Sequence, residues 1–118
     1  MSTAISPCRG EIWQISFDPK VGSEIDKDRP ALIISEDSIG KLPLRVVVPI
    51  TNWDASYTKY PWFVKINPTL TNGLTKDSGA DAFQVKSISM DRFIRKRGVL
   101  LPSLVTEIAS AIGIVVGL

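Results

Sequence analysis

The strongest constraint on the fold is the order of two patterns along the chain: many short strand-like segments come first, and one helical stretch follows. From Leu104 to Val115, apolar residues recur at helical spacing after Pro102 and Ser103, and serine is typical of N-caps. The earlier segments are rich in β-branched and aromatic residues and are separated by turn residues; they are 10–17, 29–35, 44–51, 61–66, 80–85 and 94–101. This order predicts a small, strongly curved antiparallel β-barrel of the β-rich α+β class.

Local features refine this prediction. Pro49 interrupts the segment 44–51, which predicts an edge position or a bulge. Residues 36–43 are expected to hold a turn or one short helical turn, and Asp91 is a candidate cap for a helical turn. The terminal helix is apolar on more than one face, so we expect it to be buried against both the sheet and a second copy of the chain, in a homodimer. With 118 residues, the chain is expected to form a single domain, 1–118.

The absence of histidine excludes several kinds of catalytic site. Neither a Ser-His-Asp triad nor a Cys-His pair can form, and a single cysteine, Cys8, disfavours a zinc site and allows no internal disulfide. A lone thiol fits a reducing cytoplasm. The chain also lacks the ~20 consecutive apolar residues that cross a bilayer, and residues 1–7 do not resemble a secretory signal. We therefore expect a cytoplasmic protein without a membrane segment or a metal site.

Arg29 lies between a polar loop, 20–28, and the apolar strand-like residues 31–34. Pro30 disfavours the α conformation for the residue before it, so Arg29 is expected at the rim of the strand. A guanidinium held there beside a loop suits a phosphate. An arginine before a strand is also commonly a solvated charge, and the position alone leaves both interpretations open.

A series of motifs, in register through most of the chain, resembles the MazF/PemK family of toxin endoribonucleases from bacterial type II toxin–antitoxin modules. The motifs are R-G-E-I-W (9–13), D-P-K-V-G-S-E (18–24), R-P-A-L-I-I-S (29–35), V-V-P-I-T (47–51), G-L-T-K-D-S (73–78) and F-Q-V-K-S-I-S (83–89). The V-G-S-E motif is similar to the MazF-like branch. The resemblance implies an SH3-like barrel with a C-terminal helix, a homodimer, and a cognate antitoxin as partner.

The resemblance also implies an activity, the sequence-specific cleavage of single-stranded mRNA without a metal or another cofactor. In such a reaction the ribose 2′-OH attacks the adjacent phosphorus, and the products carry a 2′,3′-cyclic phosphate and a 5′-OH. Arg29 matches the family's arginine before the proline, and Thr51 matches its hydroxyl residue at the end of the third strand, so both are expected to be catalytic. Glu24 is the nearest candidate base, although a solvated loop carboxylate is the simpler interpretation. PemK-type members carry histidine at the position of Ser23, so their acid–base assignment does not transfer, and the base stays open.

Several polar and aromatic residues are expected to bind RNA: Ser23, Asn52, Trp53, Gln84, Lys86 and Ser87. Glutamine can read base edges, whereas lysine attracts phosphate without reading sequence. Trp53 and the nearby Tyr57 could stack on bases or pack against the barrel, and both interpretations stay open. The basic residues of 92–97 are expected to add a positive field for RNA or an acidic antitoxin segment, or to keep a strand edge soluble.

Two other functions are compatible with the same sequence. CcdB proteins share this fold and poison DNA gyrase by binding it, so a non-enzymatic toxin that binds a protein target such as gyrase is the alternative. A barrel that only binds nucleic acid has weak support from the net charge of +2. Arg29 and Thr51 together favour the nuclease.

Overall fold

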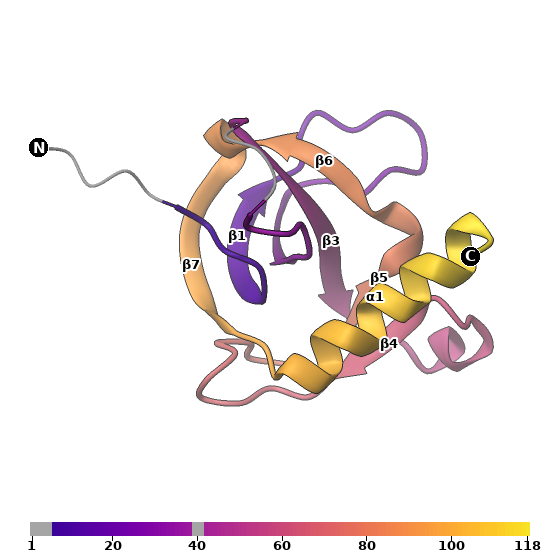
Figure 1. Cartoon of the computed structure of the whole chain (residues 1–118). Coiled ribbons are helices and arrows are strands. Elements are labelled where there is room, and N and C mark those ends of the chain that lie inside the picture. Colours follow the sequence, from indigo (N-terminus) through magenta and orange to yellow (C-terminus); the bar gives the residue numbers. More distant parts are fainter. Residues whose placement is uncertain (1–5, 39–41) are drawn as a thin grey trace, which may run out of the picture.

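The computed structural model describes residues 6–38 and 42–118, and its central element in this part of the chain is a curved antiparallel sheet of seven strands (Figure 1). The strands are β1 (Glu11–Ser16), β2 (Asp28–Ile33), β3 (Leu44–Asn52), β4 (Phe63–Ile66), β5 (Ser78–Asp81), β6 (Lys86–Ser89) and β7 (Phe93–Val99). Hydrogen bonds order them β4-β5-β3-β2-β1-β7, and β6 also pairs with β3. Helix α1 (Pro102–Val116) follows. This confirms the predicted β-rich α+β class with a C-terminal helix; within the described residues, hydrogen bonds do not join β4 to β7.

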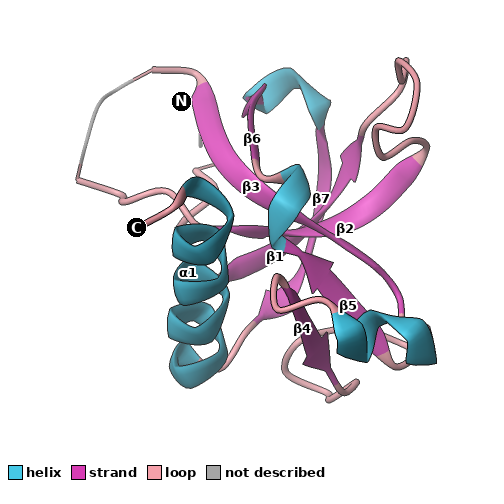
Figure 2. Ribbon diagram, turned by 90° about the vertical axis from the view of Figure 1, so that its right-hand side faces the viewer, coloured by secondary structure: helices cyan, strands magenta, loops and turns pink. Residues whose placement is uncertain are grey.

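The alternation of side chains along the strands creates a separate core on each face of the sheet. In β2, Leu32 belongs to a cluster that also contains Ile108 of α1, whereas Ala31 and Ile33 belong to a second cluster together with Trp13. Figure 2 shows α1 on one side of the sheet, which is the side of the first cluster. The two faces of β2 are therefore buried in different cores, which explains its nearly continuous apolar sequence.

Strand β3 is the central strand, so the predicted edge position of Pro49 is wrong. β3 pairs with β2 on one side; on the other side it pairs with β6 through Leu44 to Val47 and then with β5 from Ile50. Pro49 is fully buried and lies between these two partners, where the second side of β3 has no pairing residue. A missing N–H is tolerated at such a gap because no ladder hydrogen bond is lost.

Several predicted boundaries also change. The expected strand at 80–85 is β5 followed by a short 3-10 helix, η2 (Ala82–Gln84), and two further 3-10 helices are η1 (Ala55–Lys59) and η3 (Met90–Arg92). Ser89, and not Asp91, caps η3, because its side chain accepts from the Asp91 N–H. Ser103 is not the N-cap of α1: Leu101 is, without a side-chain cap, and Pro102 occupies the first turn. The predicted turn at 36–43 lies partly outside the described residues, at 39–41.

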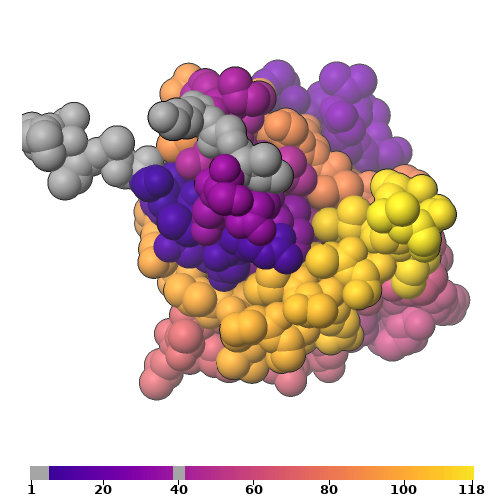
Figure 3. Space-filling model, in the orientation of Figure 1, coloured from indigo at the N-terminus to yellow at the C-terminus, as the bar shows by residue number. Residues whose placement is uncertain are grey.

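Helix α1 is half buried. Val105, Ile108 and Ala111 are buried, whereas Ile114 and Val116 are 54% and 60% exposed. Figure 3 shows the helix at the surface of the molecule. The contact with the sheet is therefore as predicted, and the contact with a second copy stays a prediction. In the described part of the chain, no helix has the length and apolarity that crossing a membrane requires.

Candidate functional site

Arg29 and Thr51 come together at one end of the pairing between β2 and β3. Ala31 pairs with Pro49, and two residues further along each strand lead to Arg29 and Thr51, which thus face the same side of the sheet. This is the face of the second core cluster, because Arg29 is opposite Ile15 of β1. The two residues that the sequence assigns to the reaction are therefore neighbours in register at the rim of a buried core.

The guanidinium of Arg29 is held by Asp26 in the loop between β1 and β2. Arg29 Nε donates to the Asp26 carbonyl oxygen at 3.2 Å, and Nη2 lies 3.5 Å from Asp26 Oδ1. Lys20 Nζ lies 3.8 Å from the other oxygen of the same carboxylate. Arg29 and Asp26 side chains are each 28% exposed, so the pair lies half buried. One edge of the guanidinium thus faces the loop, and the Nη1 donors are left for another acceptor. No local pattern in the sequence predicts this role for Asp26.

The surroundings of Thr51 are aromatic. Thr51 pairs with Gly79 of β5, and a Cβ atom at Gly79 would lie only 2.9 Å from the Trp53 ring, so the glycine lets the indole lie against the strand. Trp53 also contacts Tyr57 edge-on at 5.6 Å between ring centroids, and Tyr57 stacks on Phe63 at 3.9 Å. Both aromatic residues therefore pack on the sheet here. A role in stacking on RNA stays a prediction for Trp53.

Gln84 is bound at both ends of its side-chain amide. Its Nε2 donates to Asp81 Oδ2 at 3.1 Å, and its Oε1 accepts from the Ile25 N–H at 2.6 Å. Asp81 Oδ1 also accepts from the Phe83 N–H at 3.1 Å, which caps η2. Burial raises the pKa of the Asp81 carboxyl, while hydrogen bonds from Gln84 and Phe83 act in the opposite direction. These contacts use one of the two Nε2 donors and one of the two lone pairs of Oε1, so Gln84 reads a base only if the remaining donor or lone pair faces the RNA.

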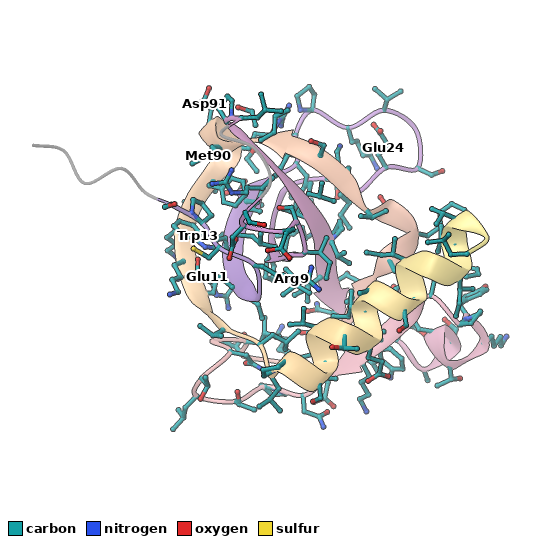
Figure 4. The ribbon with its side chains drawn as sticks, in the orientation of Figure 1. Arg9, Glu11, Trp13, Glu24, Met90 and Asp91 are labelled. Carbon is teal, nitrogen blue, oxygen red and sulfur yellow. The ribbon has the colours of Figure 1, made fainter. Side chains whose placement is uncertain are left out.

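Ser23, Glu24, Gln84 and Lys86 line two adjoining shallow hollows, although they come from segments far apart in sequence. Glu24 and Gln84 line both; Lys86 lines one, and Ser23 lines the other beside Trp62. Figure 4 shows Glu24 on the loop between β1 and β2. Its Oε1 accepts from the Val21 N–H at 2.8 Å, within the same loop. The structure thus brings together three of the six residues expected to bind RNA, Ser23, Gln84 and Lys86, with the candidate base Glu24.

Three of the expected RNA-binding residues lie apart from these hollows: Asn52, Trp53 and Ser87. Ser87 alternates with Lys86 in β6 and lines a different hollow, beside Ser35 and Arg45. Asn52 is the exposed last residue of β3. The adjacency of Lys86 and Ser87 in sequence therefore separates them in space, because successive side chains of a strand point to opposite faces.

Most of the basic cluster at 92–97 is engaged in structural contacts. Arg92 donates to the carbonyl oxygens of Ser16 and Asp18, and Arg97 donates to Gln14 and to the Gly73 carbonyl oxygen. These contacts support neighbouring strands and loops, so the cluster offers less free charge than its sequence suggests.

Lys96 forms an ion pair with Glu11 at 3.0 Å, whereas the exposed Arg95 has no polar side-chain partner among the described residues. Within 6–38 and 42–118, no group of three or more His, Cys, Asp or Glu side chains is arranged to hold a metal ion.

The chain is similar to known toxins along most of its length. A family model described as PemK-like, MazF-like toxin of type II toxin-antitoxin system matches residues 8–116. The endoribonuclease MazF9 of Mycobacterium tuberculosis is 40% identical over 96 residues, which cover 76% of this chain and 79% of that protein. The endoribonuclease toxin MazF of Escherichia coli is 31% identical over 113 residues, covering 94% of this chain and 95% of that protein.

Solved structures share the fold. The crystal structure of MazF from Deinococcus radiodurans superposes with a TM-score of 0.83 at 22% identity and covers 98% of this chain and 100% of that one. An endoribonuclease from Mycobacterial species, solved in complex with its cognate antitoxin, superposes with a TM-score of 0.74 at 20% identity, over 95% and 96% of the two chains. The predicted fold of this type, a curved antiparallel sheet with a C-terminal helix, is therefore confirmed.

Proposed function

The chain belongs to the family of PemK-like, MazF-like toxins of type II toxin–antitoxin systems, and we propose from its site that it is an endoribonuclease toxin that cleaves single-stranded mRNA at specific sequences. One observation carries the proposal: Arg29 and Thr51 face the same side at the end of the β2–β3 pairing, with Nη1 donors of Arg29 left unused by Asp26. A phosphate there meets both a guanidinium and a hydroxyl. The named relatives are endoribonucleases, which supports the same reaction class.

In the proposed reaction, the 2′-oxygen loses its proton and attacks the adjacent phosphorus, and the bond to the 5′-oxygen breaks. The leaving oxygen takes a proton to become a 5′-OH, and the other product is a 2′,3′-cyclic phosphate. Negative charge grows on the non-bridging oxygens, and Arg29 and Thr51 donate hydrogen bonds to them. Glu24 is a candidate for accepting the 2′ proton, because it lies on the loop that also carries Asp26.

The proposal also covers the residues that bind RNA and the protein partners of the toxin. RNA binding is proposed for Ser23, Gln84 and Lys86, which line the hollows, and for Asn52, Trp53 and Ser87, which lie apart from them. A cognate antitoxin, like the partner of the mycobacterial relative, keeps the toxin silent, and a second copy of the chain completes a homodimer. Because mRNA and such an antitoxin occur in the cytoplasm, the proposal includes a cytoplasmic location, and it includes a single toxin domain over 1–118. The exposed Ile114 and Val116 of α1 offer an apolar surface for such contacts.

The function is tested by incubating purified protein with a long single-stranded RNA in EDTA and mapping the ends of the products. We expect cleavage at a few sequences, with cyclic phosphate and 5′-OH ends, because the proposed donors are side chains and not a metal ion. A folded protein that leaves the RNA intact would contradict the proposal and favour the alternative, a toxin that acts by binding a protein.

Replacing Thr51 by valine keeps the shape of the side chain and removes its hydroxyl. We expect the cleavage rate to fall by roughly tenfold to a hundredfold, which corresponds to one lost hydrogen bond to a charged group. Single-turnover rates of the variant and the wild type measure this. Thr75→Val, at an exposed loop position, is the matched control and should cleave at the wild-type rate. Equal rates for Thr51→Val and wild type would remove Thr51 from the reaction.

A further inference from the structure

We propose that Asp81 and Gln84 are positioning residues that fix the loop between β1 and β2 and, through Asp26, orient Arg29. We call Asp81, Gln84 and the backbone N–H of Ile25 the loop anchor. Its effect on cleavage rests on the proposed function, whereas its effect on the loop does not. The anchor joins segments 59 residues apart in sequence, since Gln84 follows β5 and Ile25 precedes β2.

Chemistry permits only one orientation of the Gln84 amide in this arrangement. The Asp81 carboxylate accepts hydrogen bonds, so the Gln84 NH2 group must face it. The Ile25 N–H is a donor, so the Gln84 oxygen must face the loop. Both contacts are present, at 3.1 Å and 2.6 Å. Asp81 is 8% exposed, so water cannot easily replace its contacts. The buried carboxylate therefore determines which end of Gln84 meets the loop.

The anchor continues to Arg29 through one peptide unit. Ile25 is followed by Asp26, whose carbonyl oxygen accepts from Arg29 Nε and whose carboxylate lies beside Nη2. Holding the Ile25 N–H thus also holds the group that orients the guanidinium. Catalytic groups act best when neighbouring contacts restrict them to the productive direction. We infer that Asp81 acts on the reaction without contacting the RNA.

Among the described residues, the loop residues 20–26 form one hydrogen bond with a part of the chain outside β1, β2 and the segment between them. Gln84 makes this bond. Glu24 bonds within the loop to Val21, and Asp26 bonds to Arg29. The base of the loop is closed separately, since Phe17 N–H donates to the Lys27 carbonyl oxygen and Lys27 N–H to Asp18 Oδ1. Besides the anchor, the Ile25 side chain packs on the second core. Breaking the anchor should therefore loosen the tip of the loop and leave its base in place.

Two single substitutions and their combination test the anchor. In Asp81→Asn, one oxygen must serve two donors, the Phe83 N–H and the Gln84 NH2, so one contact is lost. In Gln84→Glu, two carboxylates face each other and the donor is gone. In the double variant, the new amide at position 81 keeps its oxygen on the Phe83 N–H and donates to the new carboxylate at position 84, which still accepts from the Ile25 N–H. The double variant therefore restores every contact. Between the two side chains, the donor is now at position 81 and the acceptor at position 84.

The direct measurement is amide hydrogen exchange of Ile25 by NMR. We expect each single variant to exchange this amide about tenfold faster than wild type, the factor for one lost hydrogen bond, and the double variant to recover wild-type protection. Lys27, at the base of the loop, should keep its protection throughout. Asp54→Asn is the matched control, because Asp54 caps η1 as Asp81 caps η2 but has no contact with the loop. Unchanged Ile25 exchange in the single variants overturns the proposal.

The consequence for the reaction is measured on the same variants as kcat and KM for RNA cleavage. We expect the single variants to lose about tenfold in kcat with little change in KM, and the double variant to recover, because a misdirected Arg29 affects the transition state more than binding. If the single variants cleave as wild type, the anchor does not position Arg29. If the double variant regains Ile25 protection without regaining kcat, Gln84 acts through its own amide on RNA and the positioning role is wrong. Wild-type protein that does not cleave RNA refutes the proposed function but leaves the exchange test valid.

Discussion

Arg29→Ala is expected to slow RNA cleavage by on the order of 10²–10³, the effect of removing one donor that stabilises charge in a transition state. The guanidinium lies at the rim of the second core, and its Nη1 donors are not used by Asp26. The fold should be retained, because the side chain is 28% exposed and its polar contacts among the described residues are with Asp26. Single-turnover cleavage of a defined RNA measures the effect, with a thermal unfolding curve to confirm that the variant is folded.

Two further variants separate the effect of the planar guanidinium on the cleavage rate from the effect of its charge. Arg29→Lys keeps the charge but loses the planar fork, so it should recover only part of the rate. Arg95→Ala removes the same charge from an exposed position of β7 and should change the rate by less than about threefold. If Arg29→Ala cleaves as fast as wild type, the site is wrong even where the activity is present.

The largest effect on stability is expected for Gly73→Ala. Gly73 has φ +69°, and a Cβ atom there would lie 2.1 Å from the Arg97 carbonyl oxygen in β7. The Gly73 carbonyl oxygen also accepts from Arg97 Nη2, so the turn cannot move away without losing this bond. Adding the cost of positive φ to that of overpacking gives a loss of about 3 kcal/mol or more in the free energy of unfolding. Urea unfolding of purified protein measures it.

Gly10→Ala is the matched control for this prediction. Gly10 has φ +90°, so its backbone strain is at least as unfavourable, but the nearest atom to an added Cβ is a Val105 methyl at an ordinary 3.9 Å. The control should lose about 1–2 kcal/mol, the cost of the backbone conformation alone. Equal losses for the two variants would mean that the close approach of the turn to β7 does not contribute.

The elements with a clear local pattern were predictable. The alternation of 10–17 and the β-branched run of 44–51 gave strands close to β1 and β3, and the helical spacing after Pro102 gave α1. Two details of the prediction failed, the first for a local reason and the second because of contacts between strands. Ser103 has the right side chain for a cap, but Leu101 is the N-cap, two residues earlier, and Pro102 begins the helix. Pro49 argues for an edge strand, but β3 changes partners at that point and so accommodates a proline in the centre of the sheet.

The candidate site likewise has features that local sequence predicts and features that only the tertiary structure decides. The position of Arg29 at the rim of a strand was predictable from Pro30, because a proline restricts the conformation of the residue before it. This is a local effect that the sequence by itself determines. The pairing of Arg29 with Asp26, and the binding of Gln84 to Asp81 and Ile25, were decided only by the tertiary structure. The contact of Gln84 with Ile25 requires the loop between β1 and β2 to lie against η2, and that placement comes from strand register and from the two cores. Local sequence patterns determine which residues can donate or accept, whereas the folding of distant segments onto each other determines which of them meet.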